Sequence, residues 1–460
     1  MVEFTQRSDR PPYASDVTDE LTPAVVELLQ AMIRSACVND GTPTSGHEHR
    51  NAALLRAVLE GPGIELATYE PTPGRTSLVA RMQGTDPDAP SLCLMGHTDV
   101  VPANPDGWRE DPFGGELIDG EVWGRGAVDM LNLTASMAVA VRHLADRGFR
   151  PRGDLVFLGV ADEEAGSAHG AAWLAEHHWD VIGADYVLTE SGGYVDRGRR
   201  GPIVTIAAAE KGFAWRRLTV RGTPGHGSAP YRADNALVTA AEVVRRLADY
   251  RPAPQVTDLW RRRVDALPLP DELRDALVDP ARIDTALAEM PGRAASHFHS
   301  CTHTTLSPNV VRGGSKTNTI PDRVDLELDV RTLPGETDDD VAAHLRAALG
   351  DLADRVEVST IRGHEPSASS TDTPLWRSLE RRVAAVYPDA EVVPNTIVGF
   401  TDARVFRERG AVAYGAGLFS SAISGTDFGS RFHGNDERID VESLRLTTDL
   451  WLGVVDDVLG

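Results

Sequence analysis

The chain has 460 residues, of which 46 are basic and 69 acidic, so its formal net charge is −23. Such a length allows two or three domains with a large core, and such a charge disfavours nucleic acid and anionic membranes as partners. Cys37, Cys93 and Cys301 are the three cysteines and form neither a disulfide framework nor a CxxC motif, which favours a cytoplasmic location.

The first part of the chain alternates helical and strand patterns. Its first twenty residues mix charges with prolines, which predicts no signal peptide, and no apolar run reaches the roughly 20 residues that a bilayer requires. Thr22 followed by Pro23 predicts the start of a helix that continues to Ala36. Further helices are predicted at 47–60, 131–147 and 169–177, and strands at 91–95, 154–160 and 185–188. This alternation predicts an α/β sheet with helices on its faces.

The pattern changes near residue 213. Strands are predicted at 214–221, 305–311, 324–330 and 356–360, and helices at 235–247 and 339–349. The order strand, helix, two strands, helix, strand is the split-βαβ arrangement and predicts a small α+β domain. Residues 250–300, rich in Pro, Asp and Arg, give no clear pattern. Helices predicted at 374–387 and 440–458 resume the α/β pattern, so we expect a catalytic domain of 1–212 and 366–460 with 213–365 inserted into it.

Candidate functional residues follow three predicted strands directly. His97 and Asp99 follow the strand at 91–95, Glu163 and Glu164 follow 154–160, and Glu190 follows 185–188. Each cluster alone could be a solvated loop or a helix cap. However, open α/β sheets bind ligands at the carboxyl ends of their strands. Carboxylates crowded at one such edge would repel one another, and a bound multivalent cation would remove that repulsion.

Two more candidates lie elsewhere in the chain. Asp129 precedes the helix predicted at 131–147 and could instead be its cap, while His433 precedes the last helix. Gly124 and Gly126 lack the third glycine of a dinucleotide-binding loop, which argues against a nucleotide cofactor. Two histidines with several carboxylates form a mixed nitrogen and oxygen donor set that suits zinc, cobalt or manganese.

Seven motifs in a fixed order give the sequence a family resemblance. It resembles the M20 metallopeptidases and amidohydrolases, which include carboxypeptidase G, aminoacylase, acetylornithine deacetylase and succinyl-diaminopimelate desuccinylase. The resemblance covers almost the whole chain. It implies a zinc-peptidase-like mixed sheet flanked by helices, with an inserted ferredoxin-like α+β lid and dimerisation domain. The motifs are GHTDVVPA (96–103), WGRGAVDM (123–130), ADEEAGS (161–167), TESGG (189–193), GTPGHGSAP (222–230), NTIPDR (318–323) and FHGNDER (432–438).

The resemblance also implies a ligand set for two divalent metal ions, zinc or else cobalt or manganese. Asp129 would bridge the two ions. Glu164 and His433 would complete one site, and His97 and Glu190 the other.

Other roles implied by the resemblance concern catalysis and substrate binding. Asp99 would orient a histidine ligand, and Glu163 would be the general base and acid. His226, which in isolation suggests a turn histidine, would stabilise the oxyanion in the active site of a partner subunit. Asn318 and Arg331 would bind a substrate carboxylate, although Arg331 could also be a strand-surface charge.

The function implied is a two-metal-dependent hydrolase, acting as a homodimer on a small amide. It would cleave a peptide or N-acyl-amino-acid bond next to a free carboxylate. The alternative is a catalytically inactive metal-binding or regulatory homologue of the same fold. A serine hydrolase is disfavoured, because no GxSxG elbow follows a strand. Leu131, where family members commonly have Lys, and the segment 250–300 bear on which substrate is accepted.

Overall fold

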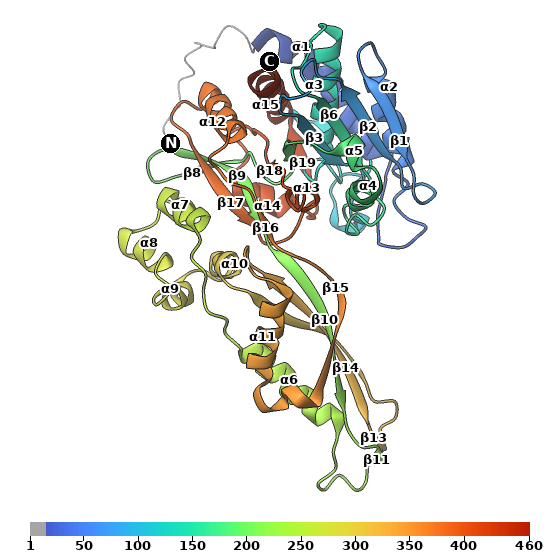
Figure 1. Cartoon of the computed structure of the whole chain (residues 1–460), viewed down its shortest axis with the longest axis vertical. Coiled ribbons are helices and arrows are strands. Elements are labelled where there is room, and N and C mark those ends of the chain that lie inside the picture. The colour runs from blue at the N-terminus through green and yellow to red at the C-terminus, as the bar shows by residue number, and fades with distance from the viewer. Residues whose placement is uncertain (1–14) are drawn as a thin grey trace.

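The computed structural model describes residues 15–460, which form a large α/β body and a smaller sheet extending from it (Figure 1). The absence of a signal peptide was predicted from residues 1–20, most of which lie outside the described residues. Within the described part of the chain, no helix has both the length and the apolar character needed to cross a bilayer.

The large body contains a ten-stranded mixed sheet. Its strand order is β1-β2-β6-β3-β7-β18-β9-β16, with β8 and β17 also paired to β9. Neighbours β6, β3, β7 and β18 run parallel, whereas β1 and β2 join antiparallel at one edge. The carboxyl ends of the four parallel strands therefore lie together. The strands are β1 (Glu65–Tyr69), β2 (Ser77–Met82), β3 (Leu92–His97), β6 (Leu155–Val160), β7 (Tyr186–Thr189), β8 (Val195–Arg197), β9 (Pro202–Glu210), β16 (Ser367–Ala368), β17 (Glu391–Ile397) and β18 (Val412–Gly415).

Helices cover both faces of this sheet, as predicted. Alternate residues of β3 show why: Leu94 packs into one core, whereas Cys93 and Met95 pack into the other. The first core is covered by α1 (Ser15–Arg34), α2 (His49–Leu59), α3 (Leu131–Asp146), α12 (Pro374–Val386) and α15 (Val441–Leu459). The second is covered by α4 (Ala171–His177), α5 (Trp179–Ile182) and α13 (Ala403–Arg407).

The first helix begins before the predicted start. It starts at Ser15, so Thr22 and Pro23 lie inside it and Thr22 is not the cap. The Thr22 hydroxyl donates to the backbone oxygen of Thr18 at 2.6 Å, which satisfies it within the helix. The other predicted helices and strands of the large body are present, with ends shifted by one or two residues.

The smaller sheet has four antiparallel strands in the order β12-β14-β10-β15. Their chain order with two helices is the predicted split-βαβ arrangement. Both helices share one core with the sheet. A short ribbon of β11 (Gly225–His226) and β13 (Thr319–Ile320) lies at the end far from the large body (Figure 1). The other elements are β10 (Gly212–Arg221), α6 (Ala236–Asp249), β12 (Thr305–Gly313), β14 (Arg323–Thr332), α11 (Asp338–Leu349) and β15 (Val356–His364).

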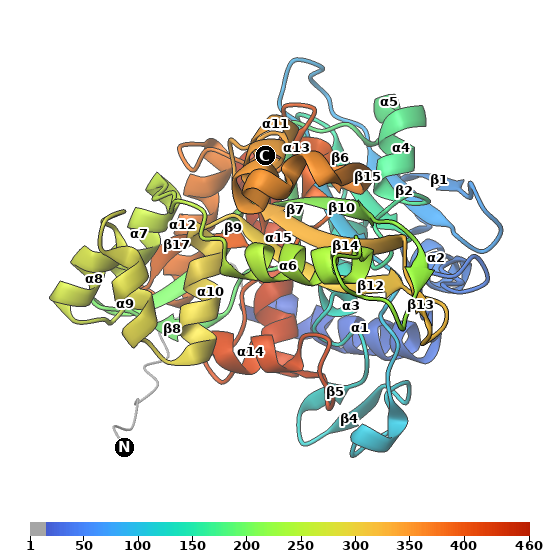
Figure 2. The same ribbon diagram turned by 90° about the horizontal axis from the view of Figure 1, so that it is seen from below.

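The segment with no predicted elements forms four short helices beside the smaller sheet (Figure 2). They are α7 (Asp258–Ala266), α8 (Asp271–Leu277), α9 (Ile283–Glu289) and α10 (Gly292–Thr302). Trp260 and Phe298 lie in their shared core. Ala266, at the end of α7, packs on Ile203 and Val393 of the large sheet. This segment therefore covers the large sheet at β9 and β17.

Candidate metal centre

Three neighbouring strands deliver the predicted site residues to one edge of the large sheet. In the order β6, β3 and β7, these parallel strands end at or just before Glu163, His97 and Glu190. All three side chains are buried. The sequence-based expectation of a shared edge therefore agrees with the structure, because parallel strands present their carboxyl ends together.

Asp129 lies at the centre of the cluster and faces a histidine with each carboxylate oxygen. Its Oδ1 is 3.1 Å from Nε2 of His97, and its Oδ2 is 2.8 Å from Nε2 of His433. The same nitrogen of His433 lies 3.4 Å from Oε2 of Glu164, and that of His97 lies 4.0 Å from Oε1 of Glu190. The structure therefore brings all five predicted ligands together around Asp129.

Donor atoms of these residues are close enough to share an ion. Those of His97, Asp129 and Glu164 lie within 4.8 Å of one another, and so do those of His97, Glu163 and Glu190. Glu163 is thus as near to His97 as a ligand would be. Oε1 of Glu164 is buried and has no hydrogen-bond partner, which leaves it available to a cation. With their mixed nitrogen and oxygen donors, these residues fit a divalent metal ion.

The protonation of the cluster reflects an excess of buried negative charge. Burial, and then the neighbouring carboxylates, raise the pKa of Glu163 and of Glu190 well above the usual value. Hydrogen bonds to Asp129 and Glu164 raise the pKa of His433 to about 10. Burial opposes protonation of His97, but Asp129 and Glu190 outweigh it and raise the pKa of that imidazole. The carboxylates thus favour cationic partners, a role that a metal ion would fill.

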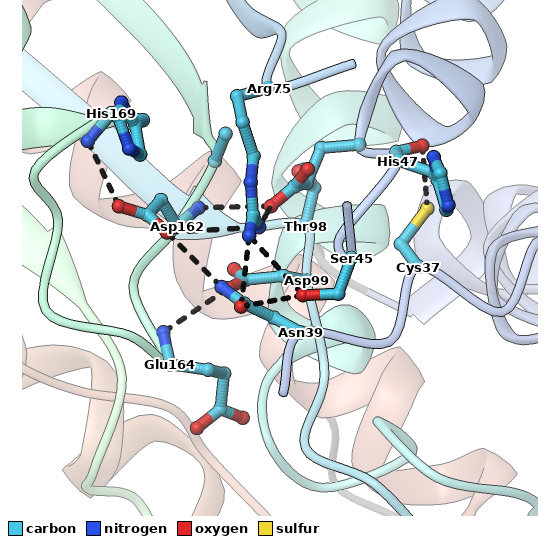
Figure 3. Close-up of polar contacts among 12 residues, drawn as sticks. Cys37, Asn39, Ser45, His47, Arg75, Thr98, Asp99, Asp162, Glu164 and His169 are labelled. Atoms are coloured by element: carbon cyan, nitrogen blue, oxygen red, sulfur yellow. Dashed lines mark hydrogen bonds and ion pairs between the residues drawn. The ribbon is translucent and has the colours of Figure 1, made fainter. Parts of the chain in front are cut away.

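Asp99 contacts His97 more closely through its backbone oxygen than through its carboxylate. Nδ1 of His97 donates to the backbone oxygen of Asp99 at 2.9 Å, and the nearer carboxylate oxygen is 3.6 Å away. Since a carbonyl oxygen only accepts, Nδ1 carries the proton and Nε2 faces the centre. The Asp99 carboxylate instead accepts the backbone N–H of Glu163 at 3.3 Å. It also accepts the backbone N–H of Glu164 at 3.2 Å (Figure 3).

The loop that carries Asp129 follows β5 (Glu121–Trp123) and is held by a residue that the sequence analysis missed. The Glu437 carboxylate accepts three backbone N–H groups between residues 126 and 129. It also pairs with Arg125 at 2.7 Å. Asp129 does not cap α3, whose cap residue is Met130. Glu437 lies in the FHGNDER motif, but its burial cannot be read from the motif.

The loop after Glu164 is also fixed by residues that lie outside the seven motifs. Arg362 donates to the backbone oxygen of Gly166 at 2.6 Å, and Arg404 donates to the same oxygen at 3.3 Å. The Ser167 hydroxyl donates to the carboxylate of Asp402. Arg362 belongs to β15, which was predicted to end at residue 360, so its position next to this loop was not foreseen.

The structure does not bring His226 and Asn318 to the metal centre of their own chain. His226 pairs with Thr319 in the ribbon of β11 and β13, next to Asn318. Its Nδ1 lies 2.7 Å from the Ser228 hydroxyl, and the imidazole is exposed. In Figure 1 this ribbon lies at the opposite end of the molecule from β3, which carries His97.

Arg331 lies at the end of β14, near the junction of the two sheets. Its guanidinium donates to Asp329 at 2.9 and 3.2 Å. Its central carbon lies 5.7 Å from the ring centre of Phe213 and 5.6 Å from that of Phe400. The side chain is half-buried against these rings and paired with a residue of its own strand, which is compatible both with substrate binding and with a strand-surface charge.

Comparison with known proteins identifies a family and relatives. The model of the family described as Peptidase family M20/M25/M40 matches residues 93–457. The N-fatty-acyl-amino acid synthase/hydrolase PM20D1 of Xenopus tropicalis is 27% identical over 453 residues, covering 94% of this chain and 85% of the relative. A succinyl-diaminopimelate desuccinylase of Gluconacetobacter diazotrophicus is 27% identical over 458 residues, covering 96% and 100%.

Solved structures share the fold at low sequence identity. The M20 family metallo-carboxypeptidase Sso-CP2 from Sulfolobus solfataricus has a TM-score of 0.69 and 19% identity, covering 96% of this chain and 99% of that chain. The YXEP protein of Bacillus subtilis, a dinuclear metal-binding peptidase from the M20 family, has a TM-score of 0.59 and 16% identity, covering 95% and 99%. These similarities agree with the mixed sheet flanked by helices.

Proposed function

The chain belongs to peptidase family M20/M25/M40, and on this basis we propose that it is a metal-dependent hydrolase of small amides that bear a carboxylate. The observation that carries the proposal is the position of Asp129 between His97 and His433, with a different oxygen facing each imidazole. One carboxylate between two nitrogen donors is suited to bridging two cations.

Five residues would hold the two cations. His97 and Glu190 would bind one, Glu164 and His433 the other, and Asp129 both. Zinc suits these donors, as do cobalt and manganese. When bound, such ions supply an activated water and a polarised carbonyl.

Glu163 would move the proton during amide cleavage. Its neighbour Glu164 lies near His433 and groups with His97 and Asp129. Glu163 groups with His97 and Glu190, so the two carboxyls share His97 but differ in their other neighbours. Glu163 would accept a proton from the attacking water and deliver it to the departing amine nitrogen. Asp99 would support both steps by holding the backbone N–H groups of Glu163 and Glu164.

The substrate class is inferred from the relatives and from Arg331. The names of the relatives include an N-fatty-acyl-amino acid hydrolase, a desuccinylase of diaminopimelate and a carboxypeptidase. Their substrates share an amide near a carboxylate. We infer that this chain cleaves a peptide or N-acyl-amino-acid bond of that kind, with Arg331 and Asn318 binding the carboxylate.

A homodimer would bring His226 to a metal centre. Because His226 and Asn318 lie far from the centre of their own chain, they would serve the active site of a second copy. Exposed apolar residues support an interface on the smaller sheet: Val238 of α6 is 67% exposed and Val311 of the edge strand β12 is 62% exposed. Residues 213–365 would then act as lid and dimerisation domain of a cytoplasmic enzyme.

The test combines metal analysis with a substrate panel. The purified protein, loaded with Zn²⁺, Co²⁺ or Mn²⁺, is assayed on N-acyl-amino acids and dipeptides, with ninhydrin detection of the released amine. We expect two metal ions per chain and hydrolysis that a chelator abolishes. Bound metal without hydrolysis of any amide would favour the alternative, an inactive metal-binding homologue.

A further inference from the structure

A buried polar network lies next to Glu164 of the metal centre (Figure 3). Its members come from four loops, because two of them share the connection between α1 and α2, and none is more than 3% exposed. Three are carboxylates and only one is a cation, so the network holds more negative than positive charge. Burying such groups is costly unless each is hydrogen-bonded. The members are Asn39, Glu48, Arg75, Asp99 and Asp162.

Asn39 joins the parts of this network through its side-chain amide. Nδ2 donates to Asp99 at 2.8 Å and to Asp162 at 3.2 Å. Oδ1 accepts from Arg75 at 3.1 Å and from the backbone N–H of Gly41 at 3.0 Å. Two acceptors on one side and two donors on the other fix the orientation of the amide. An aspartate of the same shape has no N–H to donate, so it could not make this set of contacts.

Both carboxylates bound by Asn39 act on the loop that carries Glu163 and Glu164. Asp99 accepts the backbone N–H groups of these two residues. Asp162 precedes them and has a φ of +66°, in the left-handed region that non-glycine residues rarely adopt. Its carboxylate accepts the backbone N–H of His169 at 2.9 Å, which closes the turn. The contacts of one amide thus reach both sides of Glu163.

Arg75 and Glu48 hold the far side of the network. Arg75 pairs with Glu48 at 2.7 Å and lies 3.7 Å from Asp162. Oε1 of Glu48 accepts the backbone N–H of Asp162 at 3.2 Å. Arg75 therefore neutralises the charge around Asp162, but no cation contacts Asp99 apart from His97 within the described network. The amide of Asn39 is the side-chain donor that stabilises the Asp99 carboxylate.

From these contacts we propose that Asn39 is a positioning residue. By donating to Asp99 and Asp162 together, it fixes the backbone at Glu163 and Glu164 and so aims the proton-transfer carboxyl and its neighbouring ligand. The catalytic consequence rests on the proposed function, whereas the ordering of the loop does not.

The test uses Asn39→Asp, which keeps the shape but replaces two N–H donors with an oxygen that faces two carboxylates. We expect kcat to fall about 10²-fold, the cost of misplacing a reacting group, with KM within about 2-fold of wild type. Hydrogen exchange followed by mass spectrometry on the metal-loaded protein should show faster exchange in the peptide covering residues 161–168. Peptides from β10 and β14 should exchange as in wild type, because the effect is local.

Two further variants separate positioning from general destabilisation. Ser45→Ala removes a hydroxyl that lies 3.5 Å from Oδ1 of Asn39, on the side away from the carboxylates, and should change neither readout. If Asn39→Asp does not fold, Asn39→Ser takes its place, because it adds no charge and retains one donor. Its kcat and its exchange at 161–168 should then lie between those of wild type and those expected for Asn39→Asp. A folded Asn39 variant with wild-type kcat and wild-type exchange at 161–168 would overturn the proposal. If the wild-type protein hydrolysed no amide, the proposed function would fail while the exchange data still decided the role of Asn39.

Discussion

The Glu437 carboxylate accepts the backbone N–H of Asp129 at 3.0 Å, although 308 residues separate them in the chain. Glu437 is fully buried, and burial raises its pKa to about 7 despite its ion pair with Arg125. Because Asp129 contacts both site histidines, the last motif of the sequence fixes the centre of the cluster. This relationship makes Glu437 a structural support whose removal has a measurable cost.

We expect Glu437→Ala to lower the free energy of unfolding by about 3–5 kcal/mol, because it leaves Arg125 as a buried unpaired charge. Glu437→Gln keeps an oxygen acceptor for the backbone N–H groups and should cost less. Urea unfolding of the metal-free protein measures both. An alanine variant within about 0.5 kcal/mol of wild type would show that the loop is held by other contacts.

Removal of metal should lower the melting temperature. Glu163 and Glu190 lie buried with donor atoms within 4.8 Å of one another and of His97, and a divalent cation would offset their charge. A ligand present at 100 times its dissociation constant stabilises the native state by about 2.7 kcal/mol. The test is a thermal melt in each of three conditions: after chelation, after Zn²⁺ is restored, and after Co²⁺ is restored. Identical melts in all three conditions would argue against a metal site in the folded protein.

Exchange of one carboxyl for an amide separates proton transfer from metal binding. Glu163→Gln cannot accept a proton, so turnover should fall by about 10²–10⁴ while both metals are retained. Glu164→Gln is the matched control at the next position, and it should lower metal content because Glu164 faces His433. Metal-replete Glu163→Gln with a rate near wild type would refute the assignment of Glu163.

Lys211 should make stability depend on pH. It is fully buried between β9 and β10, and its ammonium donates to the backbone oxygens of Ser300 at 2.9 Å and His303 at 2.6 Å. Burial lowers its pKa from 10.5 to about 8, with Cys301, Glu336 and Arg331 nearby. Between these two pKa values the folded protein binds fewer protons than the unfolded protein, so the free energy of unfolding rises with pH. Below pH 8 Lys211 is charged in both states, and the full cost of burying its ammonium is present.

A Lys211→Met variant isolates this contribution. From about pH 7 to about pH 10, the unfolding free energy of wild type should rise relative to the variant by up to about 3 kcal/mol. Urea unfolding of both proteins at several pH values gives the difference. Parallel pH curves for the two proteins would show that Lys211 keeps its usual pKa in the folded state.

The sequence was sufficient to predict the edge at which the site forms. His97, Glu163 and Glu190 each follow a short apolar strand, and neighbouring parallel strands end at the same edge. The structure agrees with this prediction. The shared edge follows from the parallel direction of the strands alone, so it could be predicted without knowing how the side chains pack. The connectivity of the smaller sheet was predictable for a similar reason, since its order of strands and helices allows few arrangements.

What the sequence did not reveal depends on packing. Helices α7 to α10 are short, and short helices owe their stability to tertiary contacts such as those of Trp260 and Phe298. The buried network was missed because Asn39 and Arg75 lie in polar loops where no periodicity distinguishes a buried side chain from a solvated one. Glu437 was missed although its motif was identified, since a motif gives residue types and not hydrogen-bond partners.

His226 provides the most direct test of action between subunits. Since it is exposed on β11, far from β3 of its own chain, His226→Ala should lower turnover about 10²–10³-fold and leave metal content unchanged. A mixture with Glu163→Gln should recover activity, because each hybrid dimer contains one centre with intact Glu163 and a partner that supplies His226. Random pairing makes half of the dimers hybrid, so recovery should approach about a quarter of wild type. Native mass spectrometry verifies the hybrids, and their presence without recovered activity would place His226 outside the partner's active site.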